Sequence, residues 1–327
     1  MKVLFIGGTG IISTASVELC VERGIDIYLL NRGKSARSIP AGAKSIIANY
    51  RNPAEVKAAL GDSQFDCVVD WIAYVPEQVQ YDIDFFKDRT EQYIFISSAS
   101  AYQTPPKKLP VTEFTPLDNP VWQYSRDKIA CENLLKRVYK IDDFPATIVR
   151  PSHTYDKMSL PFQERYTIID RMRKGKKIII HGDGSSLWVL THSKDFAKGF
   201  VGLLGNKAAI GETFHITSDE LLSWNQIIQY FADTIGVKLN IVHVPSEVIA
   251  RYHKDWGDSL LGDKMHSMIF DNSKIKKFVP DFKATIPFSE GVKEIMAWYD
   301  EDPSRQHQQI DSEMDKLIDK IIEDYHR

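Results

Sequence analysis

The first half of the chain alternates short apolar runs with segments of helical periodicity, and this alternation constrains the fold more than any other feature. Six runs have the character of strands: Lys2–Gly7, Asp26–Asn31, Ser45–Asn49, Cys67–Ala73, Gln92–Ser98 and Ala146–Pro151. Most intervals between them are long enough for a crossover helix. Apolar strands joined by helices are typical of a parallel sheet covered on both faces. The pattern therefore predicts an α/β fold with a doubly wound parallel sheet.

After Pro151 the alternation becomes less regular, which predicts a second, smaller α/β lobe. We assign residues 1–152 to the larger domain and residues 153–327 to the lobe, and we expect some later segments to return to the first domain. Helices are expected near Ser193–Leu204 and Ser223–Gly236. The tail predicts a C-terminal helix docked on its own chain, because one helical stripe collects its apolar residues. These are Met314, Leu317, Ile318, Ile321, Ile322 and Tyr325.

The overall composition argues against several classes of protein. The 41 basic and 44 acidic residues give a net charge of −3, and no long basic run is present, so nucleic acid is not an expected partner. The three cysteines lie far apart without metal-ligand spacing, so we expect buried thiols in a reducing compartment and no metal site. No apolar stretch reaches the roughly 20 residues that span a bilayer, and no signal peptide is recognised. We expect a cytoplasmic protein that does not bind membranes.

The turn after the first strand, Ile6–Ser13, is the most informative segment for function. Its spacing is Gly7-x-x-Gly10-x-x-Ser13, and an amphipathic stretch follows it. Glycines at this position allow a tight turn and a close approach of backbone N–H groups to a pyrophosphate at the helix N-terminus. A tight turn without a ligand is the alternative. The context of strand, turn and helix favours binding of a dinucleotide.

A second motif places Tyr124 and Lys128 four residues apart at the start of an expected helix. Side chains at positions i and i+4 lie on one helix face, so the ammonium can influence the phenol. An exposed helix face carrying both residues by chance is the alternative. The helix continues with the apolar residues Ala130, Cys131, Leu134, Leu135 and Val138, which indicates a packed element whose first turn can face a cleft.

Together these motifs resemble the short-chain dehydrogenase/reductase superfamily, in its extended, epimerase/dehydratase-like branch. The resemblance rests on the glycine turn, Phe95–Tyr102, the Tyr124/Lys128 pair, Arg150–Tyr155 and the segments "HGDG" and "THSKDFAKG", and it covers nearly the whole chain. It implies a catalytic centre of three residues. Tyr124 would transfer a proton, Ser98 would hold the substrate oxygen, and Lys128 would bind the nicotinamide ribose and lower the pKa of the phenol.

The cofactor contacts implied by the resemblance and by the strand ends form one set. They are Gly7, Thr9, Gly10, Ile11, Ile12, Asn31, Arg32, Asn49, Tyr50, Ile72, Ala73, Lys128 and Pro151. An NAD site usually has a carboxylate about 20 residues beyond the glycine turn. Here Asn31 and Arg32 follow, with Lys34 and Arg37 close behind, and a guanidinium can bind a 2′-phosphate. We therefore prefer NADP, with NAD bound through Asn31 as the alternative.

The expected substrate contacts are Ser100, His153 and Trp188. In members that act on sugar nucleotides, an asparagine and an arginine occupy the places that His153 and Trp188 take here. An indole cannot replace a guanidinium against a diphosphate, so a sugar-nucleotide substrate is in doubt. His153 is interpreted either as a ligand contact or as a hydrogen-bonded structural histidine. Asp195 is interpreted as part of a helix start and not as a catalytic acid.

The sequence thus predicts an NAD(P)-dependent oxidoreductase, epimerase or dehydratase acting on an alcohol or carbonyl carbon of a small polar, perhaps sugar-like, substrate. Nothing in the sequence decides between these reactions. The alternative is a non-catalytic or regulatory member that binds nucleotide or RNA, as the resemblance to chloroplast stem-loop-binding proteins allows. The resemblance also implies a homodimer, formed through the helices near Glu77–Arg89 and Tyr124–Tyr139.

Overall fold

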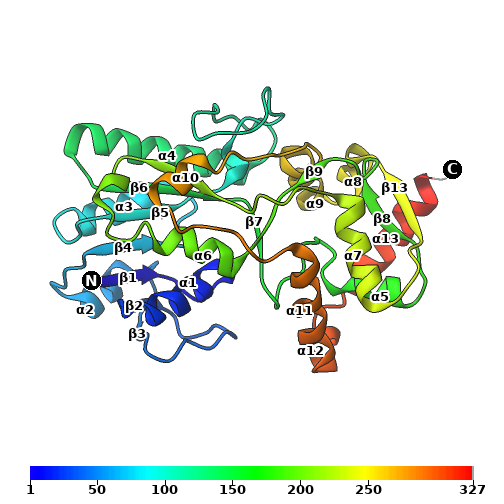
Figure 1. Cartoon of the computed structure of the whole chain (residues 1–327), viewed down its shortest axis with the longest axis horizontal. Coiled ribbons are helices and arrows are strands. Elements are labelled where there is room, and N and C mark those ends of the chain that lie inside the picture. Colours follow the sequence, from blue (N-terminus) through cyan, green and yellow to red (C-terminus); the bar gives the residue numbers. More distant parts are fainter. Residues whose placement is uncertain (326–327) are drawn as a thin grey trace.

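A parallel sheet forms the centre of the larger part of the molecule in the computed structural model, which describes residues 1–325 (Figure 1). Its seven strands, in spatial order, are β11 (Thr213–Ile216), β6 (Ala146–Pro151), β5 (Tyr93–Ile96), β4 (Cys67–Asp70), β1 (Lys2–Ile6), β2 (Asp26–Asn31) and β3 (Lys44–Ile47). All neighbouring strands run parallel. The strand order reverses between β1 and β4, which leaves a crevice at their carboxyl ends. The predicted doubly wound α/β fold is confirmed.

Helices cover both faces of this sheet. One face packs against α1 (Ile11–Glu22), α6 (Ser193–Val201) and α10 (Ser273–Phe278), and the other against α2 (Pro53–Leu60), α3 (Pro76–Phe86) and α4 (Gln123–Asp142). The central strands are buried on both sides, because each face carries apolar side chains that must leave water. Cys20, Cys67 and Cys131 are fully buried free thiols, as predicted.

Four strands end earlier than the sequence predicts, and β1 does so by one residue, at Ile6 and not at Gly7. The fourth strand ends at Asp70 and not at Ala73, because the Asp70 carboxylate accepts hydrogen bonds from the backbone N–H groups of Ile72 (2.5 Å) and Ala73 (2.8 Å). Strand β3 ends at Ile47, and β5 ends at Ile96. The predicted site residues beyond these ends therefore lie in loops at the carboxyl edge of the sheet.

The smaller lobe is built from short strand pairs and helices, and lies beside the sheet in Figure 1. In chain order its elements are β7 (His153–Tyr155), α5 (Tyr166–Arg173), β8 (Ile178–His181), β9 (Leu187–Trp188), β10 (Leu190–His192), β12 (Leu222–Ser223), α7 (Trp224–Ile235), β13 (Ile241–Val244), α8 (Ser246–Tyr252), α9 (Lys254–Ser259), the π-helix η3 (Leu260–Lys264), α11 (Phe288–Asp300), α12 (Pro303–His307) and α13 (Ser312–Tyr325). Strand β8 pairs with β13, β7 with β10 and β9 with β12. Single 3-10 turns form η1 (Ala99–Ala101) and η2 (Lys207–Ala209).

The lobe helices follow local sequence signals. Helix α7 begins with a capping box, in which Ser223 and Gln226 each satisfy the other's backbone N–H, and ends at Gly236 with φ of 70°. The C-terminal helix α13 buries Met314, Ile318, Ile321 and Ile322 against β8, β13 and α8, whereas Leu317 is partly buried and Tyr325 is 42% exposed. The predicted docking on its own chain is confirmed.

Two later segments join the large sheet. Strand β11 pairs with β6, and helix α6 packs on α1. The division of the chain at residue 152 stays a prediction. Within residues 1–325, no helix is both long enough and apolar enough to cross a bilayer.

Candidate active site

Lys128 lies at the centre of the crevice and joins three elements. It projects from the second turn of α4 and is 2% exposed. Its ammonium donates to the carbonyl oxygens of Ala73 (2.7 Å) and Ile96 (2.8 Å), which lie at the ends of β4 and β5. The rings of Tyr74 and Phe95 lie within 4.8 and 4.7 Å of it. These bonds fix the ammonium at the carboxyl edge of the sheet, where ligands of such folds bind.

A chain of hydroxyl groups leads from β5 to helix α4. The Ser98 hydroxyl lies 2.9 Å from that of Ser100, which accepts a hydrogen bond from Ser125 (2.8 Å) on α4. Ser98 also begins the turn η1 by accepting from the backbone N–H of Ser100. The phenol of Tyr124 interacts with the Ser98 hydroxyl and lies in the same pocket. The structure thus brings the three predicted catalytic residues together.

Burial sets the protonation of this centre. It raises the pKa of Tyr124 to about 12, and the hydrogen bond with Ser98 lowers it only in part. Burial likewise lowers the pKa of Lys128 to about 8, although the charge of Asp70 acts in the opposite direction. The expected lowering of the phenol pKa by Lys128 is therefore not found, because desolvation dominates. At neutral pH Tyr124 is protonated and can donate a proton to an oxygen atom.

Asn119 holds the three segments that enclose this pocket, and sequence reasoning missed it. Its amide donates to the carbonyl oxygens of Ser100 (3.1 Å) and Gly262 (2.7 Å). Its carbonyl oxygen accepts from the backbone N–H of Trp122 (2.9 Å), which begins α4. The side chain is only 2% exposed, so these bonds are shielded from water. An asparagine before an expected helix start was the available signal.

A second pocket begins at the glycine turn and extends along the ends of β1, β2 and β3. Of the predicted cofactor contacts, it is lined by Gly7, Thr9, Asn31, Arg32, Asn49, Tyr50 and Ile72. Gly7 has φ of +103°, and a Cβ atom there would lie 3.0 Å from the Ile72 side chain. Gly10 caps the N-terminus of α1, and its N–H donates to the Ser13 hydroxyl at 2.7 Å. The turn therefore keeps an open approach to a helix N-terminus, which suits an anionic ligand.

Five residues near this pocket have contacts that the sequence did not indicate. Ala73 uses both its N–H, bonded to Asp70, and its C=O, bonded to Lys128, so neither group is free for a cofactor. Ile12 packs against the core, whereas Ile11 lines the neighbouring cavity beside α1. The Tyr50 hydroxyl donates to the buried Asp82. Arg37 forms an ion pair with Asp156, which directs it away from a 2′-phosphate at Arg32.

The predicted substrate residues line the pocket that contains Ser98 and Tyr124. Its wall includes all three of them, Ser100, His153 and Trp188. Pro151, predicted as a cofactor contact, lines the same pocket. The indole N–H of Trp188 donates to Nδ1 of His153 at 3.0 Å. Burial lowers the pKa of His153 to about 3, so its imidazole is neutral at physiological pH. His153 is thus both hydrogen-bonded within the protein and part of the pocket wall.

Two residues of the π-helix η3, Asp263 and Lys264, complete this wall, and the sequence did not reveal them. They follow Tyr124 by more than a hundred residues and belong to no recognised motif.

Asp195 is a structural residue, as expected. Asp195 lies in the first turn of α6, and its carboxylate accepts hydrogen bonds from the backbone N–H groups of Thr285 (3.0 Å) and Ile286 (2.8 Å).

The family model for the NAD dependent epimerase/dehydratase family matches residues 3–217 of this chain. The chain belongs to this family. Among curated proteins, it is 27% identical to the chloroplast stem-loop binding protein of 41 kDa b of Arabidopsis thaliana over 74% of this chain and 65% of that protein. It is 30% identical to UDP-glucose 4-epimerase of Lactobacillus helveticus over 46% of this chain and 51% of that enzyme. The chain thus spans less than two thirds of these two relatives.

The human dTDP-D-glucose 4,6-dehydratase matches over a longer span, with 21% identity over 92% of this chain and 90% of that protein. Solved structures of the family share the fold. UDP-glucuronic acid 4-epimerase from Bacillus cereus, in complex with UDP-glucuronic acid and NAD, superposes with a TM-score of 0.74 and 19% identity over 92% of this chain and 99% of that one. dTDP-glucose 4,6-dehydratase from Bacillus anthracis, in complex with NAD, superposes with a TM-score of 0.76 and 18% identity over 94% of this chain and 99% of that one.

Proposed function

We propose that the protein is an NAD(P)-dependent oxidoreductase of the epimerase/dehydratase type that acts on an alcohol or carbonyl carbon of a small molecule. The observation that carries this proposal is the meeting of Ser98, Tyr124 and Lys128 beside the pocket of the glycine turn. An acid–base centre next to a dinucleotide pocket suits transfer of a hydride with a proton. A bound nicotinamide ring would supply or accept the hydride.

The protein's own residues divide the remaining work. Tyr124, protonated at neutral pH, would donate its proton to the oxygen of a carbonyl substrate. In the reverse direction its phenolate form would take the proton of an alcohol. Ser98 would hold that oxygen through its hydroxyl. Lys128 joins α4 to the segments that follow β4 and end β5, through its hydrogen bonds to Ala73 and Ile96, and would face the ribose. Burial of the centre strengthens each of these electrostatic contacts.

The adenosine end of the pocket supports NADP over NAD. Arg32, Lys34 and Arg51 line it, and among the described residues no carboxylate does. Asn31 stands where NAD enzymes usually carry an acidic residue, and its side-chain oxygen is occupied by the N–H of Gly33 at 2.7 Å. A 2′-phosphate would find three cations and no repulsion there.

Calorimetric titration with NADP and NAD tests the proposal. We expect tighter binding of NADP by the wild type and a loss of about tenfold to a hundredfold in NADP affinity for Arg32→Ala, because a hydrogen bond to a charged group contributes about 1.5–3 kcal/mol. NAD affinity should stay nearly constant. The exposed Arg251 on α8 gives a matched control, and Arg251→Ala should change neither affinity. Binding of NAD at least as tight as that of NADP by the wild type, or an Arg32→Ala protein whose NADP affinity is unchanged, would refute the assignment.

A second function is favoured by the relative that is named as a chloroplast stem-loop binding protein. In that case the chain would bind RNA and the crevice would serve regulation. Filter binding with a stem-loop RNA at several salt concentrations separates the two classes, because contacts to phosphates make affinity fall steeply with salt. Salt-sensitive RNA binding in a protein that shows no cofactor affinity would favour the second function. The homodimer implied by the resemblance is also proposed, and sedimentation velocity would test it.

A further inference from the structure

A second cavity opens beside the catalytic pocket and extends into the smaller lobe. The two share His153 and Lys264 as lining residues, so they lie next to each other. The second cavity has a volume of about 200 Å³. A substrate held at Tyr124 can therefore extend into it.

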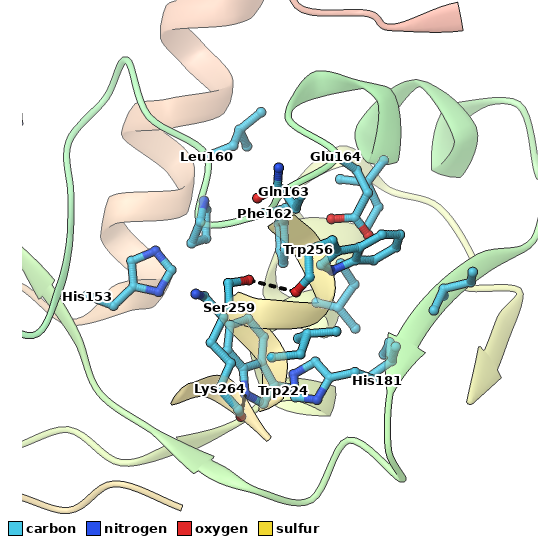
Figure 2. A pocket seen from close by; sticks show the side chains of 16 residues that line it. His153, Leu160, Phe162, Gln163, Glu164, His181, Trp224, Trp256, Ser259 and Lys264 are labelled. Carbon is cyan, nitrogen blue, oxygen red and sulfur yellow. Dashed lines mark hydrogen bonds between the residues drawn. The ribbon is translucent and has the colours of Figure 1, made fainter. Parts of the chain in front are cut away.

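Most of the cavity wall is aromatic or aliphatic. Trp224 and Trp256 present indole surfaces, and Phe162, Leu160 and Ile228 add apolar contacts. Figure 2 shows His153 on one side of this space and Glu164 on the other. Such a wall favours a flat ring, since large aromatic side chains offer apolar faces and stack on planar groups.

Glu164 is the polar group that distinguishes this cavity. Its side chain reaches inward in Figure 2, yet the residue is only 5% exposed. Within the described chain, its carboxyl is met by its own backbone N–H and by no other residue. That bond leaves further lone pairs on the carboxyl oxygens, and a ligand that donates an N–H or O–H could bind to them.

Lys264 marks the junction of the two cavities. The described residues offer its ammonium no hydrogen bond or salt bridge, and it lies 5.5 Å from the ring centre of Trp122. The two histidines of the wall carry no charge at neutral pH, because burial lowers the pKa of His153 to about 3 and that of His181 to about 4. The Nε2 atom of His181 is also buried without a partner among residues 1–325. Lys264 is thus the one cation of this wall in the described part of the chain.

This arrangement fits a nucleoside diphosphate poorly. A diphosphate carries at least two negative charges and needs several cations or N–H donors, whereas the wall supplies one lysine and opposes it with Glu164 and Asp263. A ligand with a single negative charge beside Lys264 would have that charge balanced by the ammonium group. A ring placed between the tryptophans could then reach Glu164 with a donor group.

We propose that Glu164 and Lys264 determine substrate specificity, selecting a molecule with a flat ring that bears a hydrogen-bond donor and with at most one negative charge. Glu164 accepts from the donor, Lys264 binds the anionic or carbonyl group near the reacting carbon, and the tryptophans hold the ring. The inference rests on the proposed function only in naming this molecule as the substrate. The binding site itself can be tested without turnover.

The test measures binding of three probes by calorimetry, each with and without NADP. 4-Aminobenzoate has the ring, an N–H donor and one negative charge; benzoate lacks the donor; UDP carries a diphosphate. We expect 4-aminobenzoate to bind more tightly than both. Glu164→Met should abolish its advantage over benzoate and leave benzoate affinity unchanged. Lys264→Met should weaken both carboxylates by about tenfold or more, since a charge-assisted contact is lost.

Controls separate this inference from the proposed function. Gln229→Met changes an exposed residue of α7 that lines neither cavity and should alter no affinity. Neither Glu164 nor Lys264 lines the glycine-turn pocket, so their variants should bind NADP like the wild type. If the wild type binds no cofactor but discriminates the probes, the proposed function fails and the site stands. No binding of 4-aminobenzoate at millimolar concentration, UDP binding at least as tight, or discrimination that survives in Glu164→Met would overturn the inference.

Discussion

Removal of the Glu132 carboxylate should destabilise the protein strongly, because it leaves a charged arginine in the core. Glu132 on α4 is fully buried and Arg150 on β6 is 1% exposed. The guanidinium donates to both carboxylate oxygens, at 2.8 and 2.5 Å, and the Ser97 hydroxyl donates to one of them at 2.7 Å. Burial alone would raise the pKa of Glu132, but Arg150 and Lys136 hold it below its ordinary value. The carboxylate is therefore charged at neutral pH.

The expected loss for Glu132→Ala is about 3–5 kcal/mol, the usual result of breaking a buried ion pair on one side. This is a large part of a typical stability of about 5–15 kcal/mol. Urea unfolding at neutral pH, followed by circular dichroism, measures it. Lys136 also contacts Glu132, at 3.0 Å, but is 41% exposed, so Lys136→Ala should cost less than about 1 kcal/mol. The double variant Glu132→Met, Arg150→Met should recover most of the loss.

The pH dependence gives an independent check. Because the folded pKa of Glu132 lies below its unfolded value, the stabilisation is present above that unfolded value and is lost as the pH falls through the folded pKa. Glu132→Ala should remove this part of the acid sensitivity. A loss no larger than that of Lys136→Ala would refute the reasoning, since it would mean that Arg150 is hydrated or paired elsewhere after the change.

Three further predictions concern the site. Tyr124→Phe should lower turnover of a verified substrate by about 10²–10⁴-fold with NADP affinity nearly intact, because only the proton-transfer group is lost; full turnover would exclude the acid–base role. Asn119→Ala should cost about 2–4 kcal/mol in urea unfolding, since it leaves the carbonyl groups of Ser100 and Gly262 buried without partners, and a cost within 0.5 kcal/mol of zero would show that these segments are held by other contacts. Burial raises the pKa of Glu164 from 4.5 to about 7. The free energy of unfolding is therefore highest below pH 4.5, where Glu164 is neutral in both states, and it falls as the pH rises through 7 and the buried carboxyl becomes charged. The raised pKa corresponds to about 3 kcal/mol, and Glu164→Gln should flatten the stability profile by that amount between about pH 5 and pH 8. An unchanged profile would contradict the raised pKa.

Much of the candidate site could be predicted because its residues follow strand ends and helix starts in order. Ser98 follows the end of β5 and the Tyr124/Lys128 pair lies on α4, and parallel strands bring their carboxyl ends to one edge. The protonation of Tyr124 could not be predicted, because burial depends on residues that close over it. Its pKa rises although Lys128 lies only one turn away, and Asp263, distant in sequence, contributes to that rise.

The substrate cavity illustrates the limit of the sequence most clearly. Glu164 precedes α5, Trp224 begins α7, and Lys264 ends a π-helix, so no local spacing relates them. They meet because β8 and β13 pair and the helices pack around that pair. The sequence placed a sugar-nucleotide substrate in doubt, because Trp188 and His153 stand where other members carry an arginine and an asparagine. It could not show which other side chains line the substrate cavity.

The sequence by itself determined the doubly wound sheet, the glycine turn and the order of the catalytic residues, because hydrophobic periodicity and backbone requirements act over a few neighbouring positions. The tertiary structure decided where β4 ends, how Asn119 joins three segments, and which polar groups the cavity leaves without partners. These features arise from contacts between residues far apart in the chain. Burial and charge, which set the pKa values and the ligand preference, exist only once those contacts exclude water.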